Sequence, residues 1–152
     1  MKRKSAPLPA LHVAEPPAAF LGRPPIVVDC SVLTAALFEE ELRDEARRIL
    51  VGKTLHAPLL LDSEIANVAV KKSRNGWPQA VIADALADYV RQAIEFHRPD
   101  VQAQYALAMR FGLSAYDAAY LWLAGKLQAP LATFDAKLAR AAREHLAGRA
   151  QG

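Results

Sequence analysis

The stretch Ile26-Val27-Val28-Asp29 joins a run of β-branched residues to an acid that directly follows it. Such a run favours a buried strand. Two later stretches have the same form, namely Leu59-Leu60-Leu61 before Asp62-Ser63-Glu64, and Leu131-Ala132-Thr133 before Phe134-Asp135. Ligands of open parallel sheets bind beyond the carboxyl ends of the strands. Acids that follow three strands therefore predict one shared site at that edge of a sheet.

Helical patterns separate these strands. Apolar periodicity predicts helices over residues 31–38, about 42–50, 62–74, 78–93, 100–110, 115–127 and 136–146, with strands over 26–28, 55–61, 94–97 and 131–133. Strands that alternate with helices form a parallel sheet covered on both faces. The predicted fold is α/β, a three-layer α/β/α sandwich with a central, mainly parallel sheet.

Length and composition indicate one domain. Of the 152 residues, we predict a flexible, Pro/Ala-rich leader over 1–23, a folded domain over 24–147 and a tail over 148–152. No apolar run approaches the ~18 residues of a membrane-spanning helix, so we expect no membrane association. Cys30 is the single cysteine, which excludes an internal disulfide and a cysteine-based zinc site and fits a cytoplasmic location.

The net charge of +3 is concentrated in the predicted leader. Residues 1–23 carry four basic side chains and one acid, whereas the rest of the chain carries 15 of each sign. If four of those acids share one pocket, the remaining surface of the domain is net basic by four. Such a surface accommodates a polyanion without identifying it.

Four acids are the candidates for the site. Asp29, Glu64 and Asp135 follow strands, and Asp117 lies in the first turn of the helix that begins near Ser114. Crowded carboxylates raise one another's pKa unless a cation lies among them, and the hard ions Mg²⁺ or Mn²⁺ prefer oxygen ligands. Such an ion polarises a phosphoryl oxygen and acidifies water. Phosphodiester hydrolysis is the reaction class that this arrangement predicts.

Three of these acids also have a structural explanation. Asp29 and Asp135 are each placed to cap the helix that follows, and Ser114-Ala115-Tyr116-Asp117 has the form of a capping box. The structural explanation is weakest for Glu64, because Asp62 or Ser63 would already cap its helix. The residues alone leave these alternatives open.

The motifs together resemble those of PIN domains, and more narrowly those of VapC-like ribonuclease toxins of type II toxin–antitoxin pairs. The resemblance covers about residues 25–146. It is carried, in order, by Val27-Val28-Asp29-Cys30-Ser31, Glu64-Ile65-Ala66-Asn67-Val68, Leu113-Ser114-Ala115-Tyr116-Asp117-Ala118-Ala119-Tyr120 and Leu131-Ala132-Thr133-Phe134-Asp135.

The resemblance implies a Mg²⁺- or Mn²⁺-dependent endoribonuclease that cleaves structured RNA, with tRNA or rRNA as the expected substrate. It also implies inhibition by a small cognate antitoxin and a homodimer. The implied metal-holding and water-activating residues are Asp29, Glu64, Asp117 and Asp135. Ser31, Asn67 and Thr133 match supporting positions, the two hydroxyls by hydrogen bonding to a carboxylate or to a water on the metal. Asp62 has no counterpart and is left out.

Basic residues at helix ends are the candidates for phosphate contact, although such residues also suit the helix dipole. They are Lys71, Lys72 and Arg74, followed by Lys137 and Arg140. The four histidines show no metal-ligand spacing, and we predict surface or strand-end positions for them. They are His12, His56, His97 and His145.

Two other functions compete with the nuclease. A receiver-like phosphoacceptor domain also places acids at strand ends, but it needs a lysine at the end of the last strand. Here that strand ends in Thr133-Phe134-Asp135, and Lys137 falls inside the next helix. The second alternative is a non-catalytic PIN fold that binds RNA or protein without turnover.

Overall fold

The computed structural model describes residues 5–15, 23–38 and 40–149. Its elements, in chain order, are β1 (His12–Ala14), β2 (Pro25–Val28), α1 (Cys30–Leu37), α2 (Glu40–Leu50), β3 (Thr54–Pro58), α3 (Leu61–Arg74), α4 (Gln79–Arg91), β4 (Ile94–His97), α5 (Val101–Phe111), α6 (Ala115–Leu127), β5 (Leu131–Thr133) and α7 (Ala136–Arg149).

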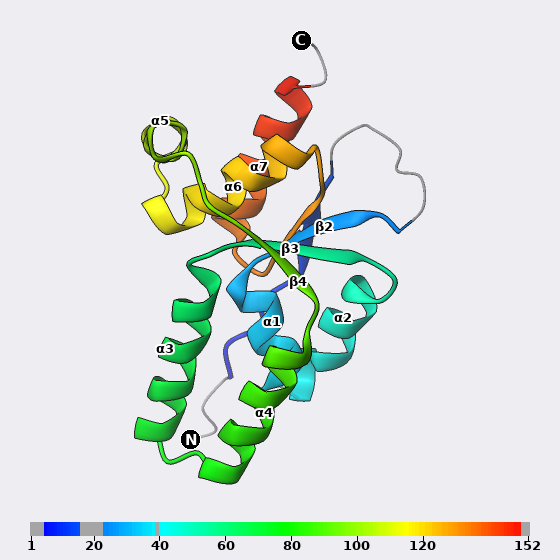
Figure 1. The fold of residues 1–152 in the computed structure, drawn as a ribbon, viewed down its shortest axis with the longest axis vertical. Helices are drawn as coiled ribbons and strands as arrows, with labels where there is room; N and C mark the ends of the chain where they lie inside the picture. The colour runs from blue at the N-terminus through cyan, green and yellow to red at the C-terminus, as the bar shows by residue number, and fades with distance from the viewer. Residues whose placement is uncertain (1–4, 16–22, 39, 150–152) are drawn as a thin grey trace.

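The strands form one sheet in the order β1-β5-β2-β3-β4. β5, β2, β3 and β4 are parallel, and β1 runs antiparallel to β5 at one edge. In Figure 1, α1 to α4 lie on one side of the sheet and α5 to α7 on the other. This arrangement confirms the predicted three-layer sandwich with a mainly parallel sheet.

The centre of the core is β2, between β5 and β3. Ile26, Val27 and Val28 are at most 1% exposed, so both faces of the strand are covered, as its uniformly apolar sequence requires. α6 packs on β2 and β3, and α7 packs on β5 and β1. The buried strand therefore delivers the next residue, Asp29, to the carboxyl-terminal edge of the sheet.

The predicted core of the second strand is wrong. β3 spans Thr54–Pro58, and Leu59 and Leu60 form a turn before α3 begins at Leu61. Proline has no N–H group to donate to the sheet, and the chain turns directly after it. Leu59 is 52% exposed, whereas Leu61 is fully buried as the first residue of the helix. Glu64 is therefore positioned by the first turn of α3 and not directly by a strand end.

The prediction of a flexible leader over 1–23 is wrong for residues 12–14. These residues form β1, in which His12, Val13 and Ala14 lie opposite Thr133, Ala132 and Leu131 of β5. Ala14 is 1% exposed and belongs to the main core. A strand forms here because the edge of β5 offers hydrogen-bonding groups that another strand can pair with. Residues 1–4 and 16–22 of the predicted leader lie outside the described residues.

The C-terminal boundary also differs from the prediction. α7 continues to Arg149, so residues 148 and 149 are helical and do not belong to a separate tail. Residues 150–152 lie outside the described part of the chain. In that described part, no helix has the length and apolar character needed to cross a membrane.

Ala14→Asp tests the contribution of β1. The substitution buries a carboxylate in the core, and we expect the free energy of unfolding to fall by roughly 2–4 kcal/mol. Leu8→Asp is the control, since Leu8 is 59% exposed and the change there should stay within about 0.5 kcal/mol. Urea unfolding of both variants measures the difference, and equal stability of the two would contradict a structural role for β1.

Candidate metal centre

Asp29 is the most buried of the four candidate acids, with 7% of its surface exposed. Its Oδ2 atom accepts hydrogen bonds from Thr133 Oγ1 at 2.6 Å and from Ser31 Oγ at 2.9 Å. Asp29 occupies the N-cap position of α1, but its side chain makes no capping hydrogen bond. Burial raises the pKa of this carboxyl, and the hydrogen bonds from Thr133 and Ser31 oppose the rise.

The two hydroxyl groups also hold the chain after β5. Ser31 Oγ accepts a hydrogen bond from the amide of Phe134 at 3.0 Å, and Thr133 Oγ1 accepts one from the amide of Asp135 at 2.9 Å. Each hydroxyl therefore donates to the Asp29 carboxylate and accepts from the backbone next to Asp135. This geometry gives Ser31 and Thr133 the carboxylate contact expected from the sequence.

Glu64 lies half-buried in the first turn of α3. Its Oε1 atom accepts a hydrogen bond of 2.8 Å from the hydroxyl of Tyr120 on α6. Burial raises the pKa of Glu64, the Tyr120 bond lowers it, and the charges of Asp29 and Asp117 raise it again. Asn67, the other polar candidate on this helix, is exposed one turn further along.

Asp117 lies half-buried in the first turn of α6. Its backbone N–H donates to Ser114 Oγ at 3.1 Å, so Ser114 caps α6. The Asp117 carboxyl has a raised pKa because of burial first, and then because of the charges of Asp29 and Asp135. A hydrogen bond with Ser114 and the charge of Lys137 oppose that rise.

Asp135 is exposed and caps α7, since its Oδ1 atom accepts the amide of Leu138 at 2.8 Å. The structural explanation offered by the sequence thus applies to Asp135. Its charge nevertheless acts on Asp117, so the capping residue belongs to the same electrostatic group.

The four acids therefore come together from the ends of β2 and β5 and from the first turns of α3 and α6. Each is electrostatically coupled to at least one of the others. Ionising several half-buried carboxylates together is unfavourable, and a hard divalent cation with oxygen ligands relieves that cost. The donor set fits Mg²⁺ or Mn²⁺.

No three acids of the quartet, all of which lie in the described part of the chain, have ligand atoms that are all within 4.8 Å of one another. Within the described ranges, the one group of three side chains whose ligand atoms all lie within 4.8 Å of one another consists of His56, Glu95 and His97. This group was not predicted, because His56 and His97 are separated by 41 residues in the chain and meet only through the pairing of β3 with β4. Surface or strand-end positions were predicted for the histidines. His97 is the last residue of β4, which confirms the prediction for this residue. The prediction is wrong for His56, which is 8% exposed and lies within β3.

The basic candidates fall into different surroundings. Lys137 acts electrostatically on Asp117 and donates to the carbonyl of Gly112. Lys71 acts on the thiol of Cys30, next to Asp29. Lys72 lies over the ring of Trp77, 3.9 Å from its centroid, which supports packing at the end of α3.

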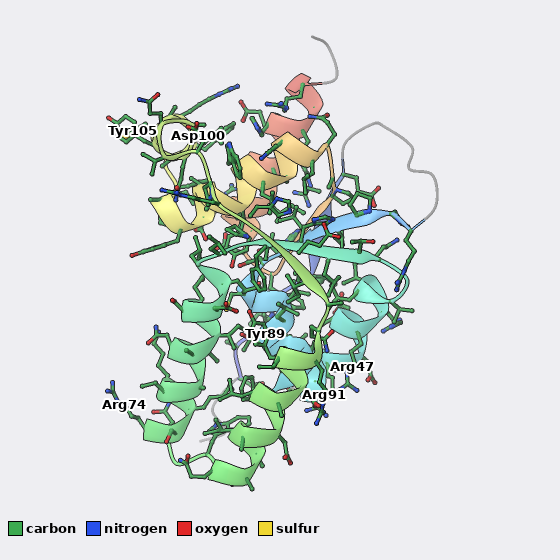
Figure 2. All side chains as sticks on the ribbon, viewed as in Figure 1. Arg47, Arg74, Tyr89, Arg91, Asp100 and Tyr105 are labelled. Carbon is green, nitrogen blue, oxygen red and sulfur yellow. The ribbon has the colours of Figure 1, made fainter. Side chains whose placement is uncertain are left out.

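The remaining two basic candidates are exposed. Arg74 points away from the body of the protein at the end of α3 remote from the sheet (Figure 2). Arg140 lies on α7, one turn after Lys137. Of the five candidates, Lys71 and Lys137 are thus the two whose charges act on the acidic site or on its immediate neighbour.

Tyr120 and Cys30 lie next to the acids of the site. Tyr120 orients Glu64 through its hydroxyl; it lies three residues after Asp117, which places both on one side of α6. Burial raises the pKa of the Cys30 thiol to about 12, so this cysteine is a small core residue and not a nucleophile.

Comparison with known proteins places this geometry in context. The family model described as PIN domain matches residues 26–144. Ribonuclease VapC3 of Pyrobaculum aerophilum is 31% identical over 123 residues, which cover 75% of this chain and 92% of that protein. Ribonuclease VapC9 of Mycobacterium tuberculosis is 35% identical over 114 residues, with coverage of 74% and 87%. The solved structure of PAE2754 from Pyrobaculum aerophilum has a TM-score of 0.62 at 23% identity, covers 88% of this chain and 95% of its own, and shows the fold alone.

Asp117→Asn tests the cost of gathering the acids. A carboxyl whose pKa is raised in the folded protein makes ionisation unfavourable to folding, so stability is lost as pH rises through the folded-state pKa. In EDTA at about pH 7.5 we therefore expect a higher Tm for the variant, by roughly 2–4 °C for each kcal/mol relieved. The gain should vanish as the pH falls below the unfolded-state pKa of about 3.9, where the acid is protonated in both the folded and the unfolded protein.

Thermal unfolding in EDTA across this pH range is the measurement. Asp84→Asn is the matched control, because Asp84 is exposed on α4 and should leave Tm unchanged. A gain in Tm that is the same at every pH, or a loss, would contradict the electrostatic explanation.

Proposed function

The chain belongs to the PIN domain family, and on that premise we propose that it is a divalent-metal-dependent endoribonuclease that hydrolyses RNA phosphodiester bonds. We further propose that it is the toxin of a toxin–antitoxin pair. The observation that carries the proposal is the coupled quartet, in which Asp29 is held by Ser31 and Thr133. The relatives named as VapC ribonucleases support RNA as the substrate.

Two kinds of residue make up the proposed site: acids that would hold the cation, and side chains that orient those acids. Asp29, Glu64, Asp117 and Asp135 would hold Mg²⁺ or Mn²⁺, which supplies Lewis acidity to the phosphoryl group and to an attacking water. Ser31 and Thr133 fix the orientation of Asp29 through the bonds to Oδ2. Tyr120 fixes Glu64 in the same way.

The proton of the attacking water needs an acceptor. A carboxylate is a more effective general base when its pKa approaches the working pH. Glu64 and Asp117 both have raised pKa values and are only half-buried. Whichever of these two carboxylates keeps an oxygen free of the cation is the proposed proton acceptor, and Lys137 beside Asp117 offsets negative charge as the anionic backbone of RNA approaches.

Cleavage of RNA by the purified chain is the direct test. With Mg²⁺ or Mn²⁺, we expect the wild type to cut tRNA or rRNA, and we expect Asp29→Asn and Asp117→Asn each to reduce the rate by at least about 10²-fold. Excess EDTA should abolish cleavage. Fragment lengths resolved on a gel give both the rate and the position of the cut.

Asp62→Asn is the matched control within the same helix turn. Asp62 accepts a hydrogen bond of 2.7 Å from Tyr89 on α4, which is not part of the quartet. The Asp62→Asn variant should therefore cleave RNA at the wild-type rate. Cleavage that persists in EDTA or in both quartet variants would refute the metal–acid mechanism. An inactive wild type would favour a non-catalytic binding module.

Binding of RNA in EDTA, measured over a range of salt concentrations, tests the RNA contacts. Lys71→Gln and Lys137→Gln should each weaken RNA binding and reduce the salt dependence of binding by about one phosphate contact. Arg74→Gln should change neither, because Arg74 lies at the remote end of α3 (Figure 2). Equal effects of all three would show that the charges act only through the net charge of the protein.

A homodimer is the proposed assembly, with a small antitoxin as the proposed inhibitor. One face of α5 exposes Val101, Tyr105 and Met109 at 75%, 67% and 68%. Their spacing of four residues places them on one side of the helix, and Tyr105 points outward in Figure 2. This apolar face is the proposed contact surface for a second copy.

Sedimentation at micromolar concentration checks the assembly. The wild type should sediment as a dimer and Tyr105→Lys as a monomer, whereas Val90→Lys, at an equally exposed position on α4, should remain dimeric. A monomeric wild type would refute the dimer. Growth arrest on expression, relieved by a small protein encoded beside this chain, would separately establish the toxin role.

A further inference from the structure

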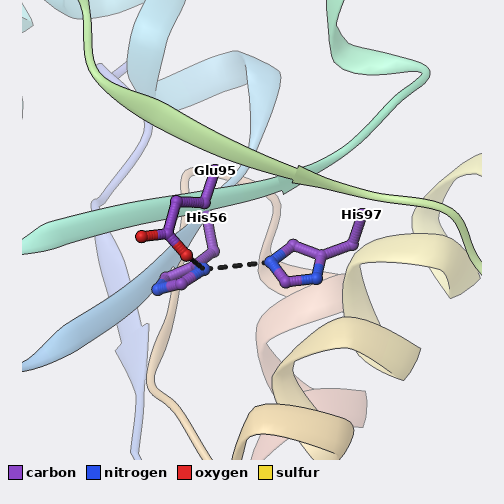
Figure 3. Close-up of side chains that lie close together, drawn as sticks. All are labelled: His56, Glu95 and His97. Atoms are coloured by element: carbon purple, nitrogen blue, oxygen red, sulfur yellow. Dashed lines mark hydrogen bonds and ion pairs between the residues drawn. The ribbon is translucent and has the colours of Figure 1, made fainter.

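A second group of side chains that could ligate a metal lies on β3 and on its neighbour β4, the last strand of the sheet. His56 on β3 lies directly opposite Glu95 on β4 in the parallel register. His97 follows Glu95 by two residues, so both side chains point to the same face of the strand. Figure 3 shows the His56 and His97 rings and the Glu95 carboxylate turned toward one another.

The distances between the ligand atoms suit a single ion. His56 Nδ1 lies 3.0 Å from His97 Nε2 and 3.5 Å from Glu95 Oε2. In a tetrahedral zinc site with bonds of about 2.0–2.1 Å, neighbouring ligand atoms are separated by roughly 3.3–3.4 Å. These two distances therefore need to change by only a few tenths of an ångström, and the ligand atoms of all three side chains lie within 4.8 Å of one another.

The donor atoms select the class of ion. Two imidazole nitrogens and one carboxylate oxygen suit Zn²⁺ and its neighbours in the transition series, whereas Mg²⁺ prefers oxygen ligands alone. Three protein ligands leave the fourth tetrahedral position to water or to another donor. The Glu95 side chain is 62% exposed and that of His56 is 10% exposed, so an ion can enter from solvent and reach an inner ligand.

This group is separate from the acidic quartet. The charges that affect the pKa of His56 are those of Glu95 and His97. The pKa values of Glu64 and Asp117 are instead raised by the charges of other quartet acids. The two groups thus share no side chain, and they differ in donor chemistry.

We propose that His56, Glu95 and His97 form a transition-metal site of the zinc class that ties the edge strand β4 to β3. β4 is only four residues long and lies at the end of the sheet. Metal that binds only the folded chain adds its binding free energy to stability. The site therefore stabilises the strand that leads into α5, and it does so independently of the proposed ribonuclease activity.

Calorimetric titration of the full, EDTA-stripped chain with Zn²⁺ tests the proposal, in saturating Mg²⁺ so that the quartet acids are occupied. We expect one equivalent of Zn²⁺ to bind and to raise Tm. Loss of a residue that only hydrogen-bonds to a metal ligand already costs about 10–100-fold in affinity. We therefore expect His97→Gln to weaken Zn²⁺ binding by at least about 100-fold and Glu95→Gln to weaken it by at least about 10-fold. With Co²⁺ in place of Zn²⁺, the wild type should show the intense visible absorption of a tetrahedral site.

His12→Gln is the matched control, since His12 lies on β1 at the opposite edge of the sheet, and it should bind Zn²⁺ as the wild type does. Glu95→Gln changes an exposed side chain, which keeps the test valid if His97→Gln fails to fold. Binding of Zn²⁺ that is unchanged in the Glu95 and His97 variants would overturn the proposal. So would binding that is lost in Asp117→Asn but kept in His97→Gln, because that result would assign the ion to the acids.

Discussion

The buried carboxylate of Asp29 is the constraint on which the acidic site depends. A carboxylate that is 7% exposed needs hydrogen-bond donors to offset the loss of water. Thr133 and Ser31 provide them at a single oxygen, and the same hydroxyls accept the amides of Asp135 and Phe134. One buried charge thus joins the ends of β2 and β5, and it places Asp135 relative to Asp29.

The other acids are placed by helices that start at the same edge of the sheet. α3 presents Glu64 and α6 presents Asp117, and Tyr120 connects the two helices through its bond to Glu64. The raised pKa values of Glu64 and Asp117 mean that the free protein holds these charges at a cost in stability. Such a cost in stability is a common compromise at functional sites, and here the acids are surrounded by the buried residues of β2 and by the buried face of α6.

The two proposed metal sites differ because of where they lie in the sheet. The quartet uses residues beyond the strand ends, where chain reversals bring carboxylates together. The His56 group uses side chains within neighbouring strands, where parallel register sets His56 opposite Glu95. Oxygen donors at one place and imidazole donors at the other would let a single small domain distinguish hard divalent ions from transition metals.

The sequence by itself determined the alternation of strands and helices, the mainly parallel sheet and the positions of Asp29, Asp117 and Asp135 at the starts of helices, because apolar periodicity and capping patterns are local. Tertiary structure alone decided that Leu59 is exposed while Leu61 is buried, and that His12–Ala14 become a strand. It also decided that His56 meets His97 across 41 residues. These outcomes depend on which strand edge a segment meets, and no pattern within a short segment encodes its partner.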